Sequence, residues 1–156
     1  FLEKEVTFFD YITEITTSFK EISEKKFIIN NSKNNNIIKI TRTIEIIFGL
    51  RNFIGNANKF ANEKITINII TNKKTTKIII NDDGPGFSND IIDKLGEPYI
   101  RSSSKKFFSK AGLGLGTFIG KTLLEKNFAT IDFENLDKEQ GASVIISWLN
   151  EDLKKI

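Results

Sequence analysis

The chain has 156 residues, a length that suits one domain with its own hydrophobic core. Its 23 basic and 20 acidic residues give a formal net charge of +3, which requires neither nucleic acid nor an anionic membrane as a partner. It has no cysteine and no histidine. Disulfides, thiolate metal sites and any mechanism that needs a histidine within these residues are therefore excluded.

No apolar run reaches the roughly 20 residues that span a bilayer, and residues 1–20 lack the pattern of a signal peptide. We therefore expect no nucleic-acid partner and no direct membrane contact from this segment. The chain also contains no methionine. We expect it to be a piece of a longer protein.

The first quarter of the chain predicts a helix followed by short extended segments. Apolar residues at helical spacing predict an amphipathic helix over residues 6–23. A short strand is expected at 27–29. An asparagine-rich loop, 30–36, then leads to a second apolar segment at 37–41.

Residues 43–62 predict the central helix of the domain. One face is apolar at three- and four-residue spacing, through Ile47, Leu50, Ile54, Ala57 and Ala61. The other face carries Asn52, Asn56 and Lys59 on successive turns. An asparagine oxygen is a neutral ligand for a hard cation, and a lysine offers positive charge to phosphate. This face suits a magnesium nucleotide, and an ordinary polar helix face is the alternative.

Two alternating segments, 64–71 and 75–81, predict a hairpin with a tight turn between them. The second strand leads into the sequence Asp-Asp-Gly-Pro-Gly-Phe at 82–87. Two glycines there allow a planar ligand to approach the backbone, and a carboxylate can accept a hydrogen bond from an amino group such as that of adenine. The alternative is an Asp-Gly turn without a ligand.

A short helix is expected at 89–95, and a segment without clear periodicity follows at 96–111. Long irregular segments in compact domains are usually functional or disordered. This one concentrates basic side chains, and it suggests a lid that closes over an anion or else a solvated basic loop. The basic residues are Arg101, Lys105, Lys106 and Lys110.

Alternating glycines at 112, 114 and 116 lead into a helix whose apolar side should carry Phe118, Ile119, Leu123 and Leu124. Glycines at a helix N-terminus leave backbone N–H groups bare for phosphate oxygens. The spacing fits neither the Rossmann nor the Walker A pattern. Two strands are expected beyond this helix, at 130–134 and 142–148, and the second is apolar enough for the sheet interior.

These segments, in this order, resemble the catalytic ATP-binding domain of bacterial sensor histidine kinases. That domain belongs to the ATPase superfamily (GHKL) of gyrase, Hsp90 and MutL. The resemblance covers about residues 27–149. Residues 52–60 resemble the N box, 82–86 the G1 box and 112–116 the G2 box, and the ATP lid would lie between the last two.

Within that family, residues 96–99 (GEPY) and 111–125 are most similar to the redox-responsive RegB type of membrane-bound kinase. The redox cysteine of that type is not in this segment, which has no cysteine.

The resemblance implies roles for polar residues by their position. Asn56 would coordinate Mg2+, and Asn52 would support the phosphate side of the site. Lys59 would contact phosphate, and Arg101 would lie near the γ-phosphate of ATP. Asn52, Lys59 and Arg101 are thus the expected catalytic residues.

The resemblance also implies how the nucleotide is held. Asp82 would accept a hydrogen bond from the adenine amino group, with Gly84 and Gly86 shaping the pocket. The end of the lid and the glycine run would surround the triphosphate, through Lys110, Gly112, Leu113, Gly114, Leu115 and Gly116.

The implied fold is a two-layer α/β (α+β) sandwich of the Bergerat type, with a mixed, mostly antiparallel sheet packed on three helices. Residues 26–156 would form this ATP-binding catalytic domain. Residues 1–25 would be an N-terminal helix that either belongs to the domain or ends a preceding dimerisation domain.

The implied function is Mg2+-dependent transfer of the ATP γ-phosphate to a histidine on a separate dimerisation and phosphotransfer domain of the same protein. A response regulator would act downstream. We expect a cytoplasmic domain of a protein anchored in the cytoplasmic membrane.

Two alternatives remain, an ATP-hydrolysing member of the superfamily and a non-catalytic binding module. Hydrolytic members generally place a glutamate four residues before the metal-binding asparagine. Asn52 occupies that position here. An amide cannot accept a proton from water, and we therefore expect negligible hydrolysis.

Overall fold

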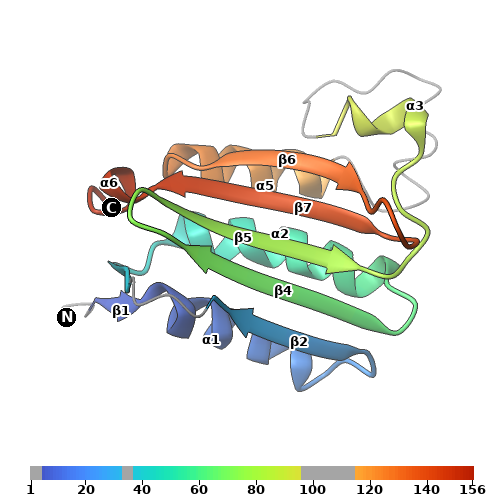
Figure 1. Ribbon diagram of the computed structural model, residues 1–156, viewed down its shortest axis with the longest axis horizontal. Coiled ribbons are helices and arrows are strands. Elements are labelled where there is room, and N and C mark those ends of the chain that lie inside the picture. The colour runs from blue at the N-terminus through green and yellow to red at the C-terminus, as the bar shows by residue number, and fades with distance from the viewer. Residues whose placement is uncertain (1–4, 33–36, 96–114) are drawn as a thin grey trace.

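The computed structural model describes residues 5–32, 37–95 and 115–156. These residues form two layers, a five-stranded sheet and a layer of helices on one of its faces (Figure 1). None of the described helices is long and apolar enough to cross a membrane. The elements in chain order are β1 (Val6–Thr7), α1 (Phe8–Lys20), β2 (Lys26–Asn31), β3 (Lys39–Ile40), α2 (Ile44–Phe60), β4 (Lys64–Thr71), β5 (Thr75–Asp82), α3 (Asn89–Ile92), α5 (Leu115–Lys126), β6 (Thr130–Asn135), β7 (Ala142–Leu149) and α6 (Asn150–Leu153).

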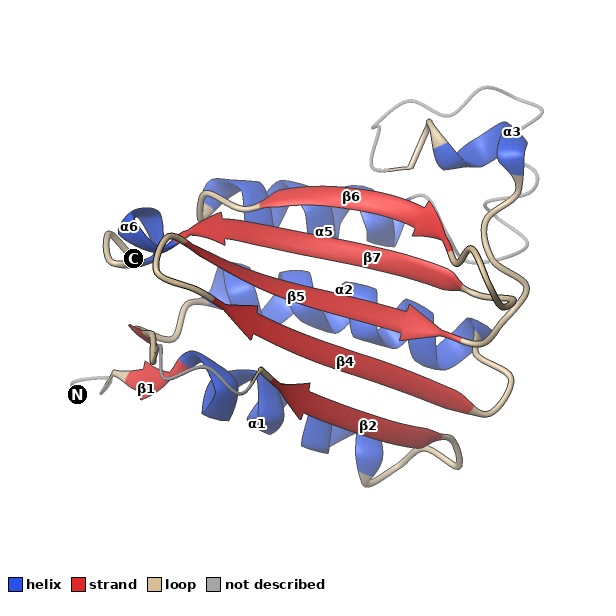
Figure 2. Ribbon diagram, in the orientation of Figure 1, coloured by secondary structure: helices blue, strands red, loops and turns tan. Residues whose placement is uncertain are grey.

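The sheet has the strand order β2-β4-β5-β7-β6, which Figure 2 shows with α1, α2 and α5 behind it. β2 and β4 are parallel, and the other neighbouring pairs are antiparallel. Alternate residues of β4 and β5, among them Ile67 and Ile80, are buried in the core, as the period of two in both segments predicts. The predicted fold class is confirmed.

The structure corrects several predicted boundaries. The helix expected over 6–23 is shorter, because Val6–Thr7 pair with β3 and the Thr7 side chain accepts a hydrogen bond from the Asp10 N–H at the start of α1. Only Lys39–Ile40 of the segment 37–41 form a strand, and this strand pairs with β1 outside the main sheet. The helix expected at 89–95 ends at Ile92.

A single large hydrophobic cluster joins the sheet to the helices. α1 contributes Phe8, Tyr11, Ile12 and Ile15 to it, so this helix packs in the same core as the sheet. The Phe8 ring meets Trp148 of β7 edge-on, with 5.3 Å between ring centroids. The domain boundary expected near residue 25 stays a prediction.

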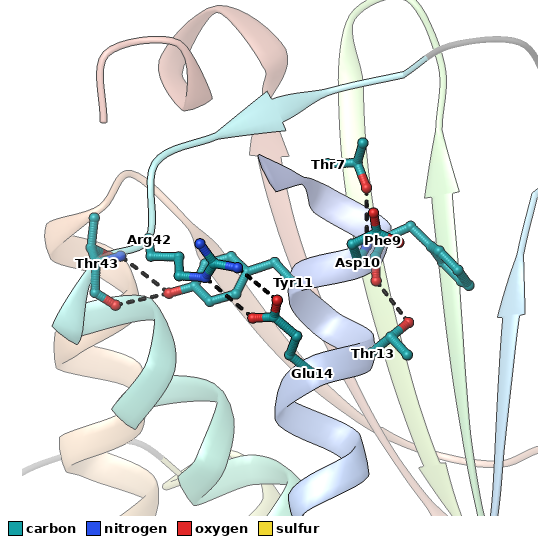
Figure 3. A network of polar contacts seen from close by, with 8 residues as sticks. All are labelled: Thr7, Phe9, Asp10, Tyr11, Thr13, Glu14, Arg42 and Thr43. Atoms are coloured by element: carbon teal, nitrogen blue, oxygen red, sulfur yellow. Dashed lines mark hydrogen bonds and ion pairs between the residues drawn. The ribbon is translucent and has the colours of Figure 1, made fainter. Parts of the chain in front are cut away.

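Polar contacts fix the start of α2 against α1 (Figure 3). The Arg42 guanidinium forms an ion pair with Glu14 of α1, with 2.6 Å between nitrogen and oxygen. The Tyr11 hydroxyl donates to the Thr43 carbonyl at 3.0 Å and accepts from the Thr43 N–H at 3.1 Å. Thr43 in turn caps α2, because its hydroxyl accepts a hydrogen bond from the Ile46 N–H.

The loop between α1 and β2 holds the other end of α2. The Ser23 hydroxyl donates to the Asn58 side-chain oxygen at 2.6 Å, and the Lys25 ammonium donates to the Asn58 carbonyl. A basic group at the last carbonyls of a helix satisfies acceptors that have no partner within the helix. The last turn of α2 is therefore held by Ser23 and Lys25, from the loop between α1 and β2.

α5 packs closely on α2 through small residues. A Cβ added at Gly49 of α2 would lie 2.6 Å from the Leu124 side chain of α5, and one added at Gly120 would lie 3.0 Å from the Phe53 ring. The apolar side predicted for this helix is wrong in part. Thr117, Gly120 and Leu124 are its buried residues, whereas Ile119 is 40% exposed.

Candidate functional site

A cavity opens between α2, the end of β5 and the start of α5. Its walls are largely apolar, and only three of the described side chains that line it are polar, namely those of Asn56, Asp82 and Thr117. The other described lining residues are Phe53, Ala57, Phe60, Ile80, Pro85, Gly86, Phe87, Ile91, Phe133, Ala142 and Val144. Apolar walls with few polar groups are typical of small-molecule sites.

Among the described residues that line this cavity, Asp82 is the acidic one. It is the last residue of β5 and is 8% exposed, and its Oδ1 accepts a hydrogen bond from the Gly84 N–H at 2.9 Å. Burial raises the pKa of the Asp82 carboxyl above its usual value, and it outweighs the lowering by hydrogen bonds from the N–H groups of Gly84 and Ala142. The cavity therefore presents a desolvated carboxylate to a hydrogen-bond donor.

The turn after Asp82 requires glycine at two positions. A Cβ at Gly84 would lie 2.1 Å from the Phe60 carbonyl oxygen, so this turn and the end of α2 touch through their backbones. Gly86 has φ +80°, in the left-handed region that favours glycine. Of the two glycines predicted to shape a pocket, Gly86 lines the cavity, and Gly84 lies against the backbone of Phe60, another residue of the lining.

The hairpin between β6 and β7 supports the turn from the other side. A Cβ at Gly141 would lie 2.0 Å from the Asp82 carbonyl oxygen. The Asn135 side chain accepts a hydrogen bond from the Phe87 N–H at 2.7 Å and donates one to the Phe87 carbonyl at 2.8 Å. Sequence reasoning missed both residues, and only the glycine before the last strand was a signal that could have pointed to one of them.

Asn56 brings an amide from α2 to the cavity. Its Nδ2 donates a hydrogen bond to the Thr117 hydroxyl of α5, with 3.3 Å between the two atoms. Thr117 is 2% exposed. The sequence analysis did not identify Thr117, although its place directly after the glycine run was a usable signal.

Asn52 and Lys59, predicted on the same face as Asn56, do not line the cavity. The Asn52 Nδ2 donates to the Phe48 carbonyl at 2.8 Å, and a Cβ at Gly116 would lie 3.3 Å from the Asn52 Oδ1. Asn52 therefore faces the start of α5. Lys59 is exposed, with its Nζ 5.5 Å from the centre of the Phe60 ring.

Of the glycine run at 112–116, the structure describes only Leu115 and Gly116. Leu115 begins α5 and is 70% exposed, and Gly116 follows it beside Asn52. The remaining predicted site residues lie outside the described residues, namely Arg101, Lys110, Gly112, Leu113 and Gly114.

The residues present fit a magnesium nucleotide. The apolar walls suit a planar base, and Asp82 supplies an acceptor for an amino group. Within the described residues, no hydrogen bond reaches the Asn56 Oδ1, and no cluster of three acidic side chains could hold a metal alone. Magnesium usually takes one or two protein oxygens and completes its shell with phosphate and water. A single amide oxygen is therefore a sufficient contribution from this part of the chain.

Comparison with known proteins gave concordant matches. Residues 42–152 match the family described as histidine kinase-, DNA gyrase B-, and HSP90-like ATPase. The sensor histidine kinase RegB of Cereibacter sphaeroides is 40% identical over 101 residues, which cover 62% of this chain and 22% of that protein. The sensor histidine kinase CpxA of Escherichia coli is 27% identical over 100 residues, covering 64% of this chain and 21% of CpxA.

Among solved structures, the catalytic domain of histidine kinase ThkA superposes with a TM-score of 0.74 at 20% identity, covering 96% of this chain and 98% of that one. This likeness establishes the fold. The chain spans about a fifth of the length of the curated relatives it matches.

Proposed function

Because the chain belongs to the histidine kinase-, DNA gyrase B- and HSP90-like ATPase family, we propose that it is the ATP-binding catalytic domain of a sensor histidine kinase. In this proposal the domain binds Mg-ATP and donates its γ-phosphate to a histidine on another domain. The fold alone would not distinguish a kinase from other members of the family. The residues of the site carry the argument.

One observation supports the proposal above the others. Asn56 and Asp82 lie 26 positions apart in the sequence, on a helix and a strand, and both face the same apolar cavity. The polar groups that the family resemblance assigns to the metal and to adenine therefore meet in one place. The backbone contact of Gly84 with Phe60 fixes the distance between the helix and the turn that carry them.

In this proposal, the residues that line the cavity hold the base and the metal, and other predicted residues, some of them outside the described ranges, contact the phosphates. Asp82 would accept a hydrogen bond from the adenine amino group, and the apolar side chains of Phe60 and Ile80, which line the cavity, would exclude water from the base. Asn56 would hold Mg2+ through its side-chain oxygen. When bound, Mg2+ neutralises phosphate charge, and phosphoryl transfer depends mainly on this neutralisation and on positioning. Lys59, Arg101, Lys110 and the glycines at 112, 114 and 116 would contact the phosphates.

The phosphoacceptor must come from outside this chain, which contains no histidine. We propose that it lies on a dimerisation and phosphotransfer domain of the same protein, and that a response regulator takes the phosphoryl group next. The 40% identity with a protein named sensor histidine kinase RegB supports the assignment to a sensor histidine kinase. We also propose that the full-length protein is anchored in the membrane, with this domain on the cytoplasmic side. That arrangement is part of the proposal.

ATP hydrolysis is the second candidate, and the surroundings of Asn52 argue against it. Its amide nitrogen donates to the Phe48 carbonyl, and its side chain lies against Gly116 at the start of α5. An amide in this position cannot accept a proton from an attacking water. We therefore expect negligible phosphate release by the domain alone.

The first test is a titration with a non-hydrolysable ATP analogue, with Mg2+ and with a chelator. We expect binding at micromolar or weaker affinity that Mg2+ strengthens, and we expect Asn56→Ala to remove the Mg2+ dependence. Asn68→Ala is the matched control. Asn68 lies on β4 between the buried residues Ile67 and Ile69, and its side-chain oxygen accepts a hydrogen bond from Asn30. Mg2+-dependent binding by Asn56→Ala would contradict the metal assignment.

In a second test, this domain is incubated with ATP radiolabelled at the γ-phosphate and with the dimerisation domain of the full-length protein. Label on the added domain supports the kinase proposal. Rapid release of free phosphate that Asn52→Ala abolishes would favour the hydrolytic alternative. Nucleotide binding without either reaction would favour a non-catalytic module.

A further inference from the structure

We infer that Thr117 is a positioning residue for the metal ligand, and that its hydroxyl holds the Asn56 amide with the oxygen toward the cation. This inference deepens the proposed function and rests on it. Its basis is the hydrogen bond from the Asn56 Nδ2 to the Thr117 Oγ1, with 3.3 Å between the atoms.

The chemistry of an amide makes its orientation important. The oxygen of an asparagine side chain can bind a cation, whereas its NH2 group carries two donors and repels one. A half-turn of the amide exchanges the two ends. A partner that accepts a hydrogen bond from the nitrogen leaves the oxygen for the metal, and no described residue donates to that oxygen.

The surroundings leave Thr117 as the anchor for the nitrogen. The other described polar side chain of the cavity is Asp82, and among the described residues the Asn56 amide bonds Thr117 and not Asp82, whose Oδ1 accepts from the Gly84 N–H. Thr117 is 2% exposed, so water has little access to replace its hydroxyl. Removing a group that orients a metal ligand in this way commonly lowers metal affinity by about 10- to 100-fold.

The fold brings the two side chains together from separate helices. Asn56 lies near the end of α2 and Thr117 in the first turn of α5. The glycines at 49 and 120 let the two helices approach closely, because a Cβ at either position would meet side chains of the other helix. The metal ligand is therefore oriented by the same helix that begins at the glycine run.

The test compares Thr117→Val, which removes the hydroxyl at nearly constant shape, with Thr117→Ser, which keeps it. Binding of a non-hydrolysable ATP analogue is measured over a series of Mg2+ concentrations and with a chelator. We expect Thr117→Val to raise the Mg2+ concentration for half-maximal enhancement by about tenfold. Affinity without metal should change less than about twofold, and Thr117→Ser should behave as the wild type.

Thr16→Val is the matched control, because Thr16 is also a buried helical threonine, and its hydroxyl donates a hydrogen bond to the Ile12 carbonyl within α1. Thr117→Ala serves if the valine variant does not fold. Unchanged Mg2+ dependence in these variants of Thr117 would overturn the inference. An equal loss of affinity with and without Mg2+ would also overturn it, because the hydroxyl would then shape the cavity instead.

Failure of the proposed function would look different. A wild-type domain that does not bind the analogue, or an Asn56→Ala variant with normal Mg2+ dependence, would remove the premise and overturn both proposals. Loss of Mg2+ dependence in Asn56→Ala together with normal dependence in Thr117→Val would overturn only the role of Thr117.

Discussion

Asp82 and Asp83 are neighbours at the end of β5, yet their carboxylates lie in opposite kinds of surroundings. Asp82 faces the cavity and is buried. The Asp83 Oδ1 accepts hydrogen bonds from the N–H groups of Asn62, Glu63 and Lys64, at 2.8, 3.0 and 3.2 Å. One acid faces the cavity, and the other is bound by the turn between α2 and β4.

The pKa shifts of the two acids follow from this difference. Burial raises the pKa of the Asp82 carboxyl. Burial alone would also raise the pKa of Asp83, but hydrogen bonds from the N–H groups of Glu63, Lys64 and Asn62 outweigh it and hold that pKa below its usual value. Asp82 ends β5 and Asp83 begins the turn that follows, so two adjacent acids face different surroundings and can serve binding and folding separately.

Replacing the cavity acid should have the largest effect on binding. We expect Asp82→Ala to weaken adenine nucleotide binding by about 50-fold, because a hydrogen bond to a charged, desolvated acceptor is lost. The measurement is the dissociation constant of a non-hydrolysable ATP analogue by calorimetry. Asp83→Ala is the control and should bind within about threefold of the wild type. Equal affinities in the two variants would remove the distinction between the acids.

Replacing the turn acid should instead affect stability. We expect Asp83→Ala to lower the free energy of unfolding by about 1 to 2 kcal/mol, by analogy with the loss of a side chain that caps backbone N–H groups. Urea denaturation at pH 7 measures this change. A variant as stable as the wild type would show that the three N–H groups are equally well satisfied by water.

Regular patterns made much of this fold predictable. The apolar period of the central helix and the alternation of β4 and β5 gave those elements almost to the residue. Asn56 and Asp82 were predicted in one site, and both line one cavity. The resemblance to a family of ATP-binding domains is confirmed by the match over residues 42–152.

Contacts between distant segments were not predictable in the same way. Asn135 holds the backbone of Phe87 across 48 positions, and Gly141 is required by the carbonyl of Asp82. The sequence around each residue contains no local pattern from which its partner could be predicted. The face of α5 was predicted from hydrophobicity, but close packing on α2 selects small residues such as Gly120 instead.

The opposite pKa shifts of Asp82 and Asp83 predict opposite changes of stability with pH. We expect these changes to be smaller than the effects of the alanine substitutions. The pKa of Asp82 is raised in the folded state, so its neutral form is favoured there, and stability is lost as pH rises from the usual value of 3.8 through the folded value. At pH 7 we therefore expect Asp82→Asn to be more stable than the wild type, with a difference that shrinks as pH falls through this range.

Asp83 should show the reverse. Its pKa is lowered in the folded state, so its contribution is present above the usual value of 3.8 and is lost as pH falls through the folded value. Asp83→Asn should be less stable than the wild type at pH 7, and the gap should close in acid. Urea denaturation of the wild type and both variants between pH 7 and about pH 3 measures how the stability difference of each variant changes with pH. Solvent screening reduces this slope at Asp83. Slopes of the same sign would mean that the cavity does not desolvate Asp82, and adenine would then meet a solvated carboxylate.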